Sequence, residues 1–220
     1  NFESAGNLLY AVAKLGGMKK NASGEYTLLN IPFAQYLKGD FDFAKNLVID
    51  NRNSLAFHFG AGIAIPYGNA TMLPFETRYF SGANSVRGWS VRDLGPGSFP
   101  GDNNFMNQSG DIKLDASIEY RTRLFWKFRG ALFVDAGNIW TIRNYKDQPG
   151  GQFKFDKFYK QIAVAYGLGL RLDLDFFVLR FDGGMKAINP AYEKKKDRYP
   201  IIHPKFSRDF AFHFAVGYPF

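Results

Sequence analysis

Two kinds of side chain alternate without interruption in the stretch Asp111-Ile112-Lys113-Leu114-Asp115-Ala116-Ser117-Ile118-Glu119-Tyr120-Arg121-Thr122-Arg123-Leu124. Apart from one threonine, the even-numbered positions are apolar or aromatic, and the odd-numbered positions carry a charge or a hydroxyl group. Successive side chains of a β-strand point to opposite faces. This period of two therefore predicts a long strand with one apolar and one polar face.

The same alternation runs through most of the chain, and helical periodicity is hard to find anywhere. Residues 2–15 are ambiguous. A long strand is expected within residues 25–50, with Ile31, Phe33 and Leu37 on its apolar face. About eight strands result, joined alternately by short turns and long loops, an asymmetry typical of transmembrane barrels. The further strands are expected at residues 54–67, 131–137, 161–173, 177–186 and 209–220.

Such a sheet fits a soluble β-sandwich or a membrane barrel, because both hide one face of every strand. Many of the strands reach the roughly nine to eleven residues needed to cross a bilayer, which favours the barrel. Aromatic residues also cluster at strand ends, as interfacial girdles require. The sequence therefore predicts an all-β fold, a transmembrane antiparallel β-barrel. The aromatic residues at strand ends are Tyr67, Phe125, Trp126, Trp140, Tyr218 and Phe220.

The composition excludes several classes of function. The 220 residues include no Cys, so no disulfide framework, thiol nucleophile or cysteine zinc site is available. His58, His203 and His213 lie on separate segments without the spacing of metal ligands. No phosphate-binding loop and no nucleophile elbow is present. We therefore expect no catalytic residues, no metal and no cofactor, and we expect that the chain is not an enzyme.

The charge pattern gives no support for nucleic acid as a partner. The net charge is +8, but the basic residues are scattered, with one short run at residues 194–198. We expect a solvated loop tip there, with contact to anionic lipid headgroups as the alternative. No run of apolar residues is long enough for a transmembrane helix. The chain begins at Asn1 without a signal peptide, so a mature or excised piece is expected.

The longest segment that does not alternate runs from about Gly68 to Gln108. Its centre is rich in small residues, which let the backbone turn tightly and approach other walls. An exposed loop would leave Arg87 solvated, whereas an enclosed guanidinium needs a carboxylate partner. The central stretch reads Arg78-Tyr79-Phe80-Ser81-Gly82-Ala83-Asn84-Ser85-Val86-Arg87-Gly88-Trp89.

Val86-Arg87-Gly88-Trp89, preceded by Gly82, resembles the loop motif of the BamA/TamA-like superfamily of outer-membrane assembly and translocation barrels. Phe133-Val134-Asp135-Ala136-Gly137 resembles the F-x-D-x-G strand motif of that superfamily, and Glu119 matches an acidic residue on the preceding strand. The resemblance implies that the loop folds into the barrel and that Arg87 pairs with Glu119 and Asp135. Both acids fall on the polar faces of their strands, so the alternation independently supports the pairing.

The resemblance extends to the end of the chain. Gly217 matches the glycine at which the last strand of the superfamily kinks. Residues 1–220 resemble only the C-terminal half of a sixteen-stranded barrel, so we expect one barrel segment, with POTRA domains and N-terminal strands preceding it. The opening residues 2–7 and Trp89 look most like the Bacteroidota branch, the TamL-type proteins. The residues that resemble the C-terminal sorting signal are Phe214, Val216, Tyr218 and Phe220.

By this resemblance, the chain is expected to belong to an insertion or translocation factor that crosses the bacterial outer membrane several times. The implied partners are outer-membrane lipid or lipopolysaccharide, unfolded outer-membrane protein clients, and periplasmic or lipoprotein accessory subunits. An openable seam at the last strand would template an incoming strand. Two alternatives remain open, namely a passive small barrel and the membrane anchor of a secreted enzyme. The sequence upstream would separate the three.

Overall fold

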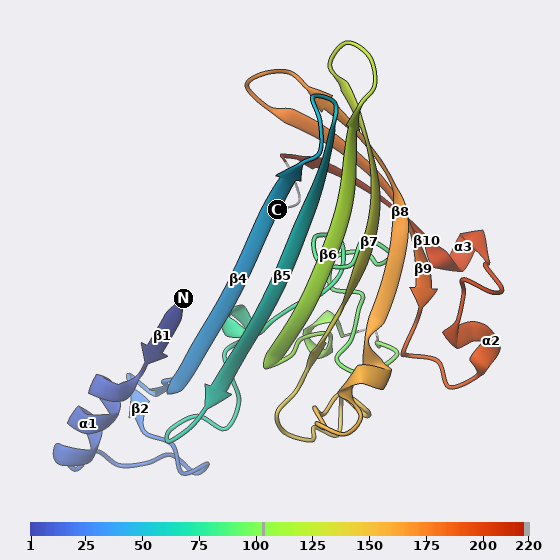
Figure 1. The fold of residues 1–220 in the computed structure, drawn as a ribbon. Helices are drawn as coiled ribbons and strands as arrows, with labels where there is room; N and C mark the ends of the chain where they lie inside the picture. Colours follow the sequence, from blue (N-terminus) through green and yellow to red (C-terminus); the bar gives the residue numbers. More distant parts are fainter. Residues whose placement is uncertain (103, 218–220) are drawn as a thin grey trace.

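The computed structural model describes residues 1–102 and 104–217, which contain one large antiparallel sheet (Figure 1). Each strand of this sheet pairs antiparallel with the next one along the chain, apart from a small hairpin that stands outside the sheet. The predicted all-β antiparallel class is therefore confirmed. The strands of the sheet are β1 (Phe2–Ala5), β4 (Tyr36–Val48), β5 (Asn53–Pro66), β6 (Ile112–Arg123), β7 (Phe128–Trp140), β8 (Ala163–Asp173), β9 (Val178–Ile188) and β10 (Phe210–Val216).

The remaining elements are short and lie in the connections between these strands. The hairpin outside the sheet consists of β2 (Thr27–Leu28) and β3 (Ile31–Pro32). The helical segments are α1 (Asn7–Leu15), η1 (Phe75–Thr77), η2 (Phe105–Asn107), η3 (Phe158–Gln161), α2 (Lys195–Arg198) and α3 (Phe206–Asp209). Among the described residues, none of the helices has the length and apolar character that crossing a membrane would require.

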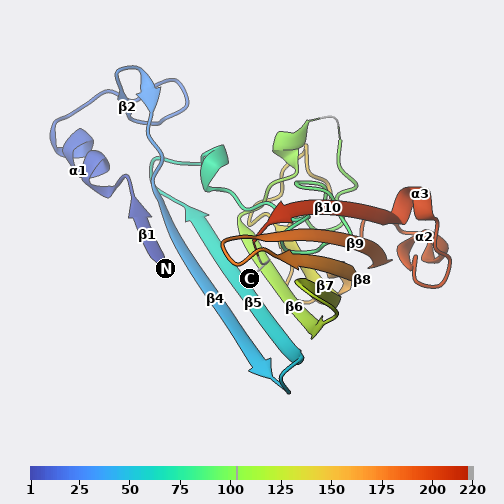
Figure 2. The ribbon, with the colours of Figure 1, turned by 90° about the horizontal axis from the view of Figure 1, so that it is seen from above.

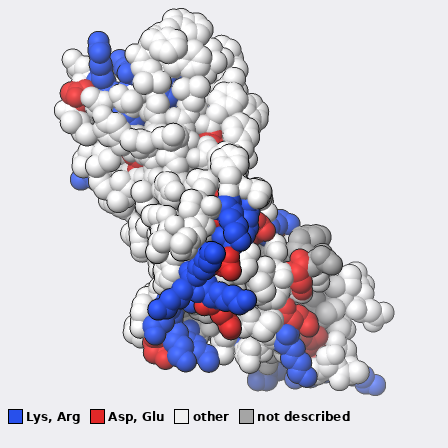
Figure 3. Space-filling view, turned by 90° about the vertical axis from the view of Figure 1, so that its right-hand side faces the viewer, with Lys and Arg blue, Asp and Glu red and all other residues white. Residues whose placement is uncertain are grey.

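The sheet is curved, and the connection between β5 and β6 lies on its concave side (Figure 2). Glu119 and Asp135 point to this side and are buried, whereas Ile118 and Val134 point to the convex side and are about half exposed. On the face that contains β8 to β10, charged side chains gather toward the two ends and leave a broad region nearly free of charge (Figure 3). An exposed apolar band between charged ends is the surface that a lipid-facing barrel wall presents.

The sheet is open among the described residues. β1 pairs with β4 and β10 pairs with β9, and these two outer strands form the edges of the sheet. The pairing of β10 runs from Phe210 opposite Met185 to Val216 opposite Leu179. Closure into a barrel therefore stays a prediction, and so does the assignment of residues 1–220 to the second half of a larger one.

The expectation that helical periodicity is hard to find is wrong for α1. Leu8, Val12 and Leu15 recur there at helical spacing. These three side chains are exposed, while Ala13 on the opposite face is buried. The helix has nine residues, which is shorter than the length at which a helix is stable by itself. Tyr10 on this helix packs edge-on against Tyr26, with ring centroids 5.6 Å apart, a contact that the sequence pattern alone does not indicate.

The boundary of the first long strand also differs from the expectation. Ile31 lies in β3 and Phe33 follows it, so neither belongs to β4, which begins at Tyr36. The cause is local: Leu29 and Asn30 both adopt positive φ angles of 50° and 65°. Two successive residues of this kind form the tight turn of a two-residue hairpin. The chain therefore reverses direction before β4 begins.

Trp140 is not an interfacial girdle residue, because its side chain is fully buried. Its indole Nε1 donates to Gln161 Oε1 at 2.9 Å, and its ring packs edge-on against Phe153 and Phe158. Trp126, in contrast, lies at the β6–β7 turn and is 76% exposed, as a girdle residue requires. An aromatic residue at a strand end can thus anchor a loop or face the interface, and the sequence does not distinguish the two.

Candidate functional site

Residues 67–111 connect β5 to β6, and backbone hydrogen bonds join them to one another and to the sheet. Tyr79 and Gly110 exchange two backbone hydrogen bonds of 2.8 and 2.9 Å, and the Asp111 N–H donates to the carbonyl of Trp140 at 2.7 Å. In the middle of the loop, the Gly97 N–H donates to the carbonyl of Ile139 at 2.7 Å. The loop therefore follows β7 along the concave face, in agreement with its path in Figure 2.

The loop motif forms a compact turn that begins at Gly82. The N–H groups of Ser85 and Val86 donate to the Gly82 carbonyl at 2.7 and 3.0 Å. Gly82 has a φ angle of 131°, and a Cβ atom at this position would collide with the carbonyl oxygen of Ser90. Only glycine fits such a conformation without strain. The turn directs the side chain of Arg87 onto the sheet.

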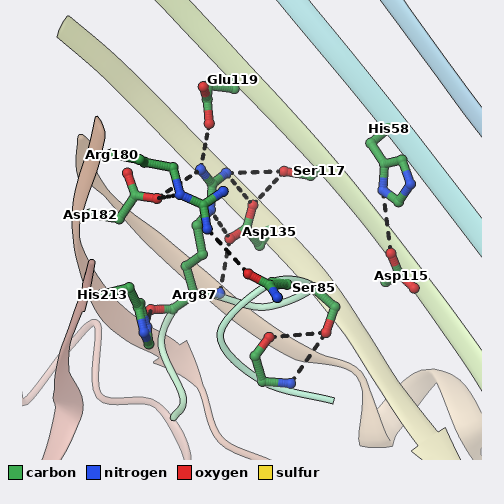
Figure 4. A network of polar contacts seen from close by, with 12 residues as sticks. His58, Ser85, Arg87, Asp115, Ser117, Glu119, Asp135, Arg180, Asp182 and His213 are labelled. Atoms are coloured by element: carbon green, nitrogen blue, oxygen red, sulfur yellow. Dashed lines mark hydrogen bonds and ion pairs between the residues drawn. The ribbon is translucent and has the colours of Figure 1, made fainter. Parts of the chain in front are cut away.

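The Arg87 guanidinium lies between Glu119 of β6 and Asp135 of β7 (Figure 4). Its Nε and Nη2 atoms each donate to one Asp135 carboxylate oxygen at 2.8 Å, and Nη1 donates to Glu119. The backbone N–H of Arg87 adds a third hydrogen bond to Asp135 at 3.0 Å. Ser117 donates to Asp135 at 2.5 Å and accepts from Arg87 Nη2 at 3.2 Å. The structure thus brings together the three charged residues named by the resemblance.

All three charges are removed from water, with exposures of 1% or less. Burial disfavours the charged guanidinium, but the hydrogen bonds and charges of Asp135 and Glu119 outweigh it and raise the pKa of Arg87 above its ordinary value. A paired geometry of this kind is needed to keep buried charges tolerable. The docked position of the loop therefore depends on these ion pairs.

The other residues of the strand motif shape the floor of the site. The Phe133 ring lies under the guanidinium, 3.6 Å from the Arg87 Cζ atom to the ring centroid. It has room because Gly167 lies opposite on β8, where a Cβ atom would meet the ring. A Cβ atom at Gly137 would stand 2.6 Å from the Leu114 carbonyl oxygen on β6. The phenylalanine therefore supports the arginine, and the glycine permits a close approach of the two strands.

The apolar residues of the loop motif pack on β8. Val86 and Trp89 form a buried cluster with Leu94 of the loop and with two alanines of β8. A Cβ atom at Gly88 would stand 2.8 Å from the Cβ atom of Ala165, so a side chain there would lift the loop away. The Trp89 ring also lies 5.2 Å from the ammonium of Lys186. The motif thus joins an ion pair and an apolar contact on adjacent strands. The two alanines are Ala163 and Ala165.

Sequence reasoning missed a second group of buried charges beside the first. Arg171 donates to Asp182 at 2.5 Å and contacts Glu119 at 3.2 Å. Arg180 contacts Asp182 at 3.1 Å and donates to Asn84 of the loop at 3.2 Å. The alternation places these side chains on the polar faces of β8 and β9, but it does not indicate which of them converge. We call the six residues the Arg87 cluster: Arg87, Glu119, Asp135, Arg171, Arg180 and Asp182.

The last strand also reaches the loop, a contact that sequence reasoning missed. His213 Nε2 lies 2.9 Å from the backbone carbonyl oxygen of Arg87. After β10, Gly217 has a φ angle of 98°, and its N–H donates to the Val178 carbonyl at 2.7 Å. Phe214 and Val216 are exposed on the convex face. Tyr218 and Phe220, predicted as parts of the sorting signal, lie outside the described residues.

Toward the opposite edge of the sheet, the loop also contacts β4. The Tyr79 hydroxyl donates to Asp40 of β4 at 2.5 Å, and the ammonium of Lys38 lies 4.8 Å from the Tyr79 ring centroid. We call Lys38, Asp40 and Tyr79 the β4 contact. Nearby, His58 Nε2 lies 2.8 Å from Asp42, whose side chain is 70% exposed. Within residues 1–102 and 104–217, no group of three or more His, Cys, Asp or Glu side chains is arranged to hold a metal ion.

Comparisons with known proteins identify the family of this chain. The Omp85 superfamily domain matches residues 16–220. Sorting and assembly machinery component 50 homolog A of Xenopus laevis is 28% identical over 145 residues, which are 63% of this chain and 30% of that protein. Outer membrane protein assembly factor BamA of Neisseria meningitidis serogroup B is 33% identical over 96 residues, which are 39% of this chain and 12% of that protein. The chain therefore spans at most 30% of the length of these two relatives.

The fold is also similar to a solved structure. The crystal structure of BamA from Haemophilus ducreyi lacking POTRA domains 1-3 matches with a TM-score of 0.56 at 18% sequence identity. The match covers 83% of this chain and 35% of that one. At this identity the likeness concerns the course of the backbone, and the curved antiparallel sheet is what the two structures share.

Proposed function

The chain belongs to the Omp85 superfamily, and from this premise we propose that it forms the C-terminal part of the barrel of an outer-membrane protein assembly or translocation factor. The predicted BamA/TamA-like membership is thereby confirmed, while the affinity to the TamL-type branch stays a prediction. The protein would cross the bacterial outer membrane several times. It would act through hydrogen bonds and packing, without covalent chemistry or a cofactor.

The observation that carries this proposal is the docked loop. A channel wall does not need a loop held against it by a fully buried arginine, since buried ion pairs are costly to assemble. Here Arg87 contacts two strands with its guanidinium, and the apolar part of the motif packs on a third. Such a loop supports the wall that ends in β10. A factor that opens at its last strand would need a support of this kind beside the opening.

The proposed mechanism uses the free edge of β10. An edge strand presents unpaired N–H and C=O groups, which can pair with a strand of another chain. β10 pairs with β9 on one side, and in the described residues its other side is an edge. Gly217 at the end of the strand adopts a positive φ angle, where the backbone leaves the regular strand. An unfolded client could therefore add its strand at this seam.

The passive eight-stranded barrel has less support. A small closed barrel requires pairing between its first and last strands. In the described part of the chain, β1 and β10 stand at opposite edges of the sheet instead. An interior of that size would also be filled by side chains and would leave little room for residues 67–111. No observation favours the anchor of a secreted enzyme over the assembly factor.

The proposed partners follow from the surfaces. The exposed apolar side chains of the convex face would contact outer-membrane lipid or lipopolysaccharide, and the β10 edge would receive unfolded outer-membrane protein clients. Periplasmic or lipoprotein subunits would bind parts of the protein outside this sheet. The BamA relative is named as an outer membrane protein assembly factor. That name supports the proposal for this chain without extending to particular clients.

The proposal is tested by replacing Arg87 in the full-length protein, reconstituted in liposomes. The folding rate of an outer-membrane β-barrel client is measured by protease protection. Arg87→Ala should lower the rate strongly, and Arg87→Lys should restore little, because an ammonium cannot bridge two acids as a planar guanidinium does. Heat-modifiable migration on a gel checks that each variant is folded. A folded Arg87→Ala protein that assembles clients at the wild-type rate would refute the proposed mechanism.

A further inference from the structure

His213 joins the last strand to the docked loop through one hydrogen bond. Its Nε2 atom lies 2.9 Å from the carbonyl oxygen of Arg87, and a carbonyl only accepts hydrogen bonds, so Nε2 carries the hydrogen. The neutral Nε2–H tautomer and the imidazolium ion both donate there. The contact therefore requires no particular charge on the ring. It requires a donor that extends as far from the strand as Nε2 does.

The same arginine is held at both of its ends by different parts of the sheet. Its guanidinium contacts Glu119 on β6 and Asp135 on β7. Its carbonyl oxygen rests against Gly184 on β9, where a Cβ atom would collide with it, and accepts from His213 on β10. Arg87 thus spans the wall from β6 to β10. A single residue of the loop therefore contacts both the middle and the last strands of this wall.

The position of His213 in the sheet strengthens this connection. It stands opposite Asp182 in the β9–β10 pairing, and Asp182 belongs to the Arg87 cluster, with one oxygen 3.8 Å from Arg87 Nη1. The neighbouring residues Phe212 and Phe214 point outward and are exposed. β10 therefore exposes its aromatic side chains on the convex face and contacts the loop with its histidine. Figure 4 shows the imidazole directed at the backbone of Arg87.

We propose that His213 is a positioning residue that couples the last strand to the docked loop, so that the strand is held in register while the loop is docked and is freed when the loop leaves. This inference rests on the proposed function, in which β10 forms the seam. β10 has seven residues and pairs with β9 on one side. A short edge strand held on one side opens readily. The hydrogen bond between His213 and the loop would therefore change how often the C-terminal half of β10 opens.

The test compares two variants of similar size in the full-length protein, reconstituted in lipid nanodiscs. His213→Leu keeps an apolar side chain without a donor, whereas His213→Gln keeps an N–H group at the ε position. Hydrogen exchange is measured at the backbone amides of Ala215 and Gly217, whose N–H groups lie on the side of β10 that pairs with β9. His213→Leu should speed exchange about five-fold, the change that corresponds to one ordinary hydrogen bond. His213→Gln should exchange at nearly the wild-type rate.

Arg87→Ala and the double variant complete a thermodynamic cycle. If the loop holds the strand through this contact, then Arg87→Ala speeds exchange in β10 as well, and adding His213→Leu changes little more. His58→Leu serves as the control, because this imidazole lies on β5 and contacts Asp42 and Asp115. It should leave exchange in β10 unchanged. Should His213→Leu fail to fold, His213→Asn replaces it, because its amide is too short to reach the carbonyl.

Each outcome decides a separate point. The coupling would be overturned if folded His213→Leu exchanged at the wild-type rate. It would also be overturned if His213→Gln exchanged as fast as His213→Leu. Strictly additive effects of Arg87→Ala and His213→Leu would overturn it too. Client assembly is measured separately. If exchange shows the coupling while Arg87→Ala assembles clients normally, the proposed function fails and the coupling stands. If Arg87→Ala abolishes assembly while His213→Leu exchanges like wild type, the coupling alone fails.

Discussion

Two of the places where the loop meets the concave face, the Arg87 cluster and the β4 contact, are built differently. In the cluster, Arg87, Glu119 and Asp135 are buried, and each charge has two or more polar partners. Around the β4 contact the charged groups keep more contact with water, and the Asp42 side chain nearby is 70% exposed. Alternation along the strands sends charged residues to the same side in both regions. Burial decides how strongly each charge depends on its partner.

Asp135→Asn should give the largest difference between the two regions. Asp135 accepts three hydrogen bonds from Arg87 and one from Ser117. The asparagine amide is neutral, so the buried guanidinium would lose one of its negatively charged partners. Removing one partner of a buried pair costs about 3–5 kcal/mol. We expect a loss of that size in the opening free energy of residues 82–89, measured by hydrogen exchange in the full-length protein.

The matched control is Asp42→Asn in the β4 region. Asp42 contacts His58 within the sheet and its side chain is 70% exposed, so the same chemical change should alter exchange in the loop very little. Equal effects of the two substitutions would mean that burial does not distinguish the regions. The concave side would then be wet throughout, and the ion pairs of Arg87 would be ordinary surface contacts.

Gly184→Ala should give the next largest effect. The added methyl group would collide with the Arg87 carbonyl oxygen, and relief requires a shift of the loop or of β9. Overpacking of this kind costs roughly 1–3 kcal/mol. Gly39→Ala on β4 is the control, because a Cβ atom there meets nothing within 4 Å. The Gly184 variant should expose residues 82–89 to limited proteolysis, while the Gly39 variant should be cleaved like wild type. Identical cleavage patterns would contradict the close approach.

Phe133→Leu tests the ring under the guanidinium. The substitution keeps an apolar side chain but removes the aromatic face 3.6 Å below Arg87. A desolvated cation–π contact is worth about 2 kcal/mol, and leucine recovers part of the packing, so we expect a loss of about 1–2 kcal/mol in the opening free energy of the loop. Phe41→Leu on the exposed side of β4 provides the comparison. A loss at position 41 as large as that at position 133 would show that aromatic area, and not the guanidinium, is what matters.

The sequence predicted much of this arrangement because period two is a local property. The faces of Glu119, Asp135 and the outward residues of β6 follow from alternation alone, and the resemblance supplied the pairing with Arg87. Alternation also assigned Arg171, Asp182 and His213 to the polar side. Their convergence depends on register and curvature, and those depend on pairing between strands far apart in the chain.

Local exceptions account for the remaining differences. The hairpin turn at Leu29 and Asn30 depends on two positive φ angles, which asparagine adopts readily but which leucine does not indicate. α1 shows helical spacing over nine residues only, too few to outweigh the strand pattern around it. Trp140 lies at a strand end like a girdle residue, but η3 covers it and accepts its N–H at Gln161. In each case a neighbouring segment, not the residue itself, determined the outcome.

Lys38→Met should have the smallest effect, and it sharpens the comparison because it removes the same type of interaction in the other region. The Lys38 ammonium lies 4.8 Å from the Tyr79 ring centroid and 3.4 Å from the Thr77 carbonyl oxygen, where water still reaches it. A cation–π contact at such a site is worth about 0.5–1 kcal/mol. Methionine keeps the length of the side chain, so the loss should come from the charge.

The effects of substitutions in the two regions should depend differently on salt concentration. At 1 M salt the Debye length falls to about 3 Å, which screens an accessible ammonium but not a fully buried pair. The effect of Lys38→Met on exchange at residues 77–81 should therefore disappear between 0.1 and about 1 M salt. The effect of Asp135→Asn on residues 82–89 should persist over the same range. If both effects fall together, water and ions reach Arg87 as freely as Lys38, and packing of Val86 and Trp89, not the ion pairs of Arg87, holds the loop motif on the sheet.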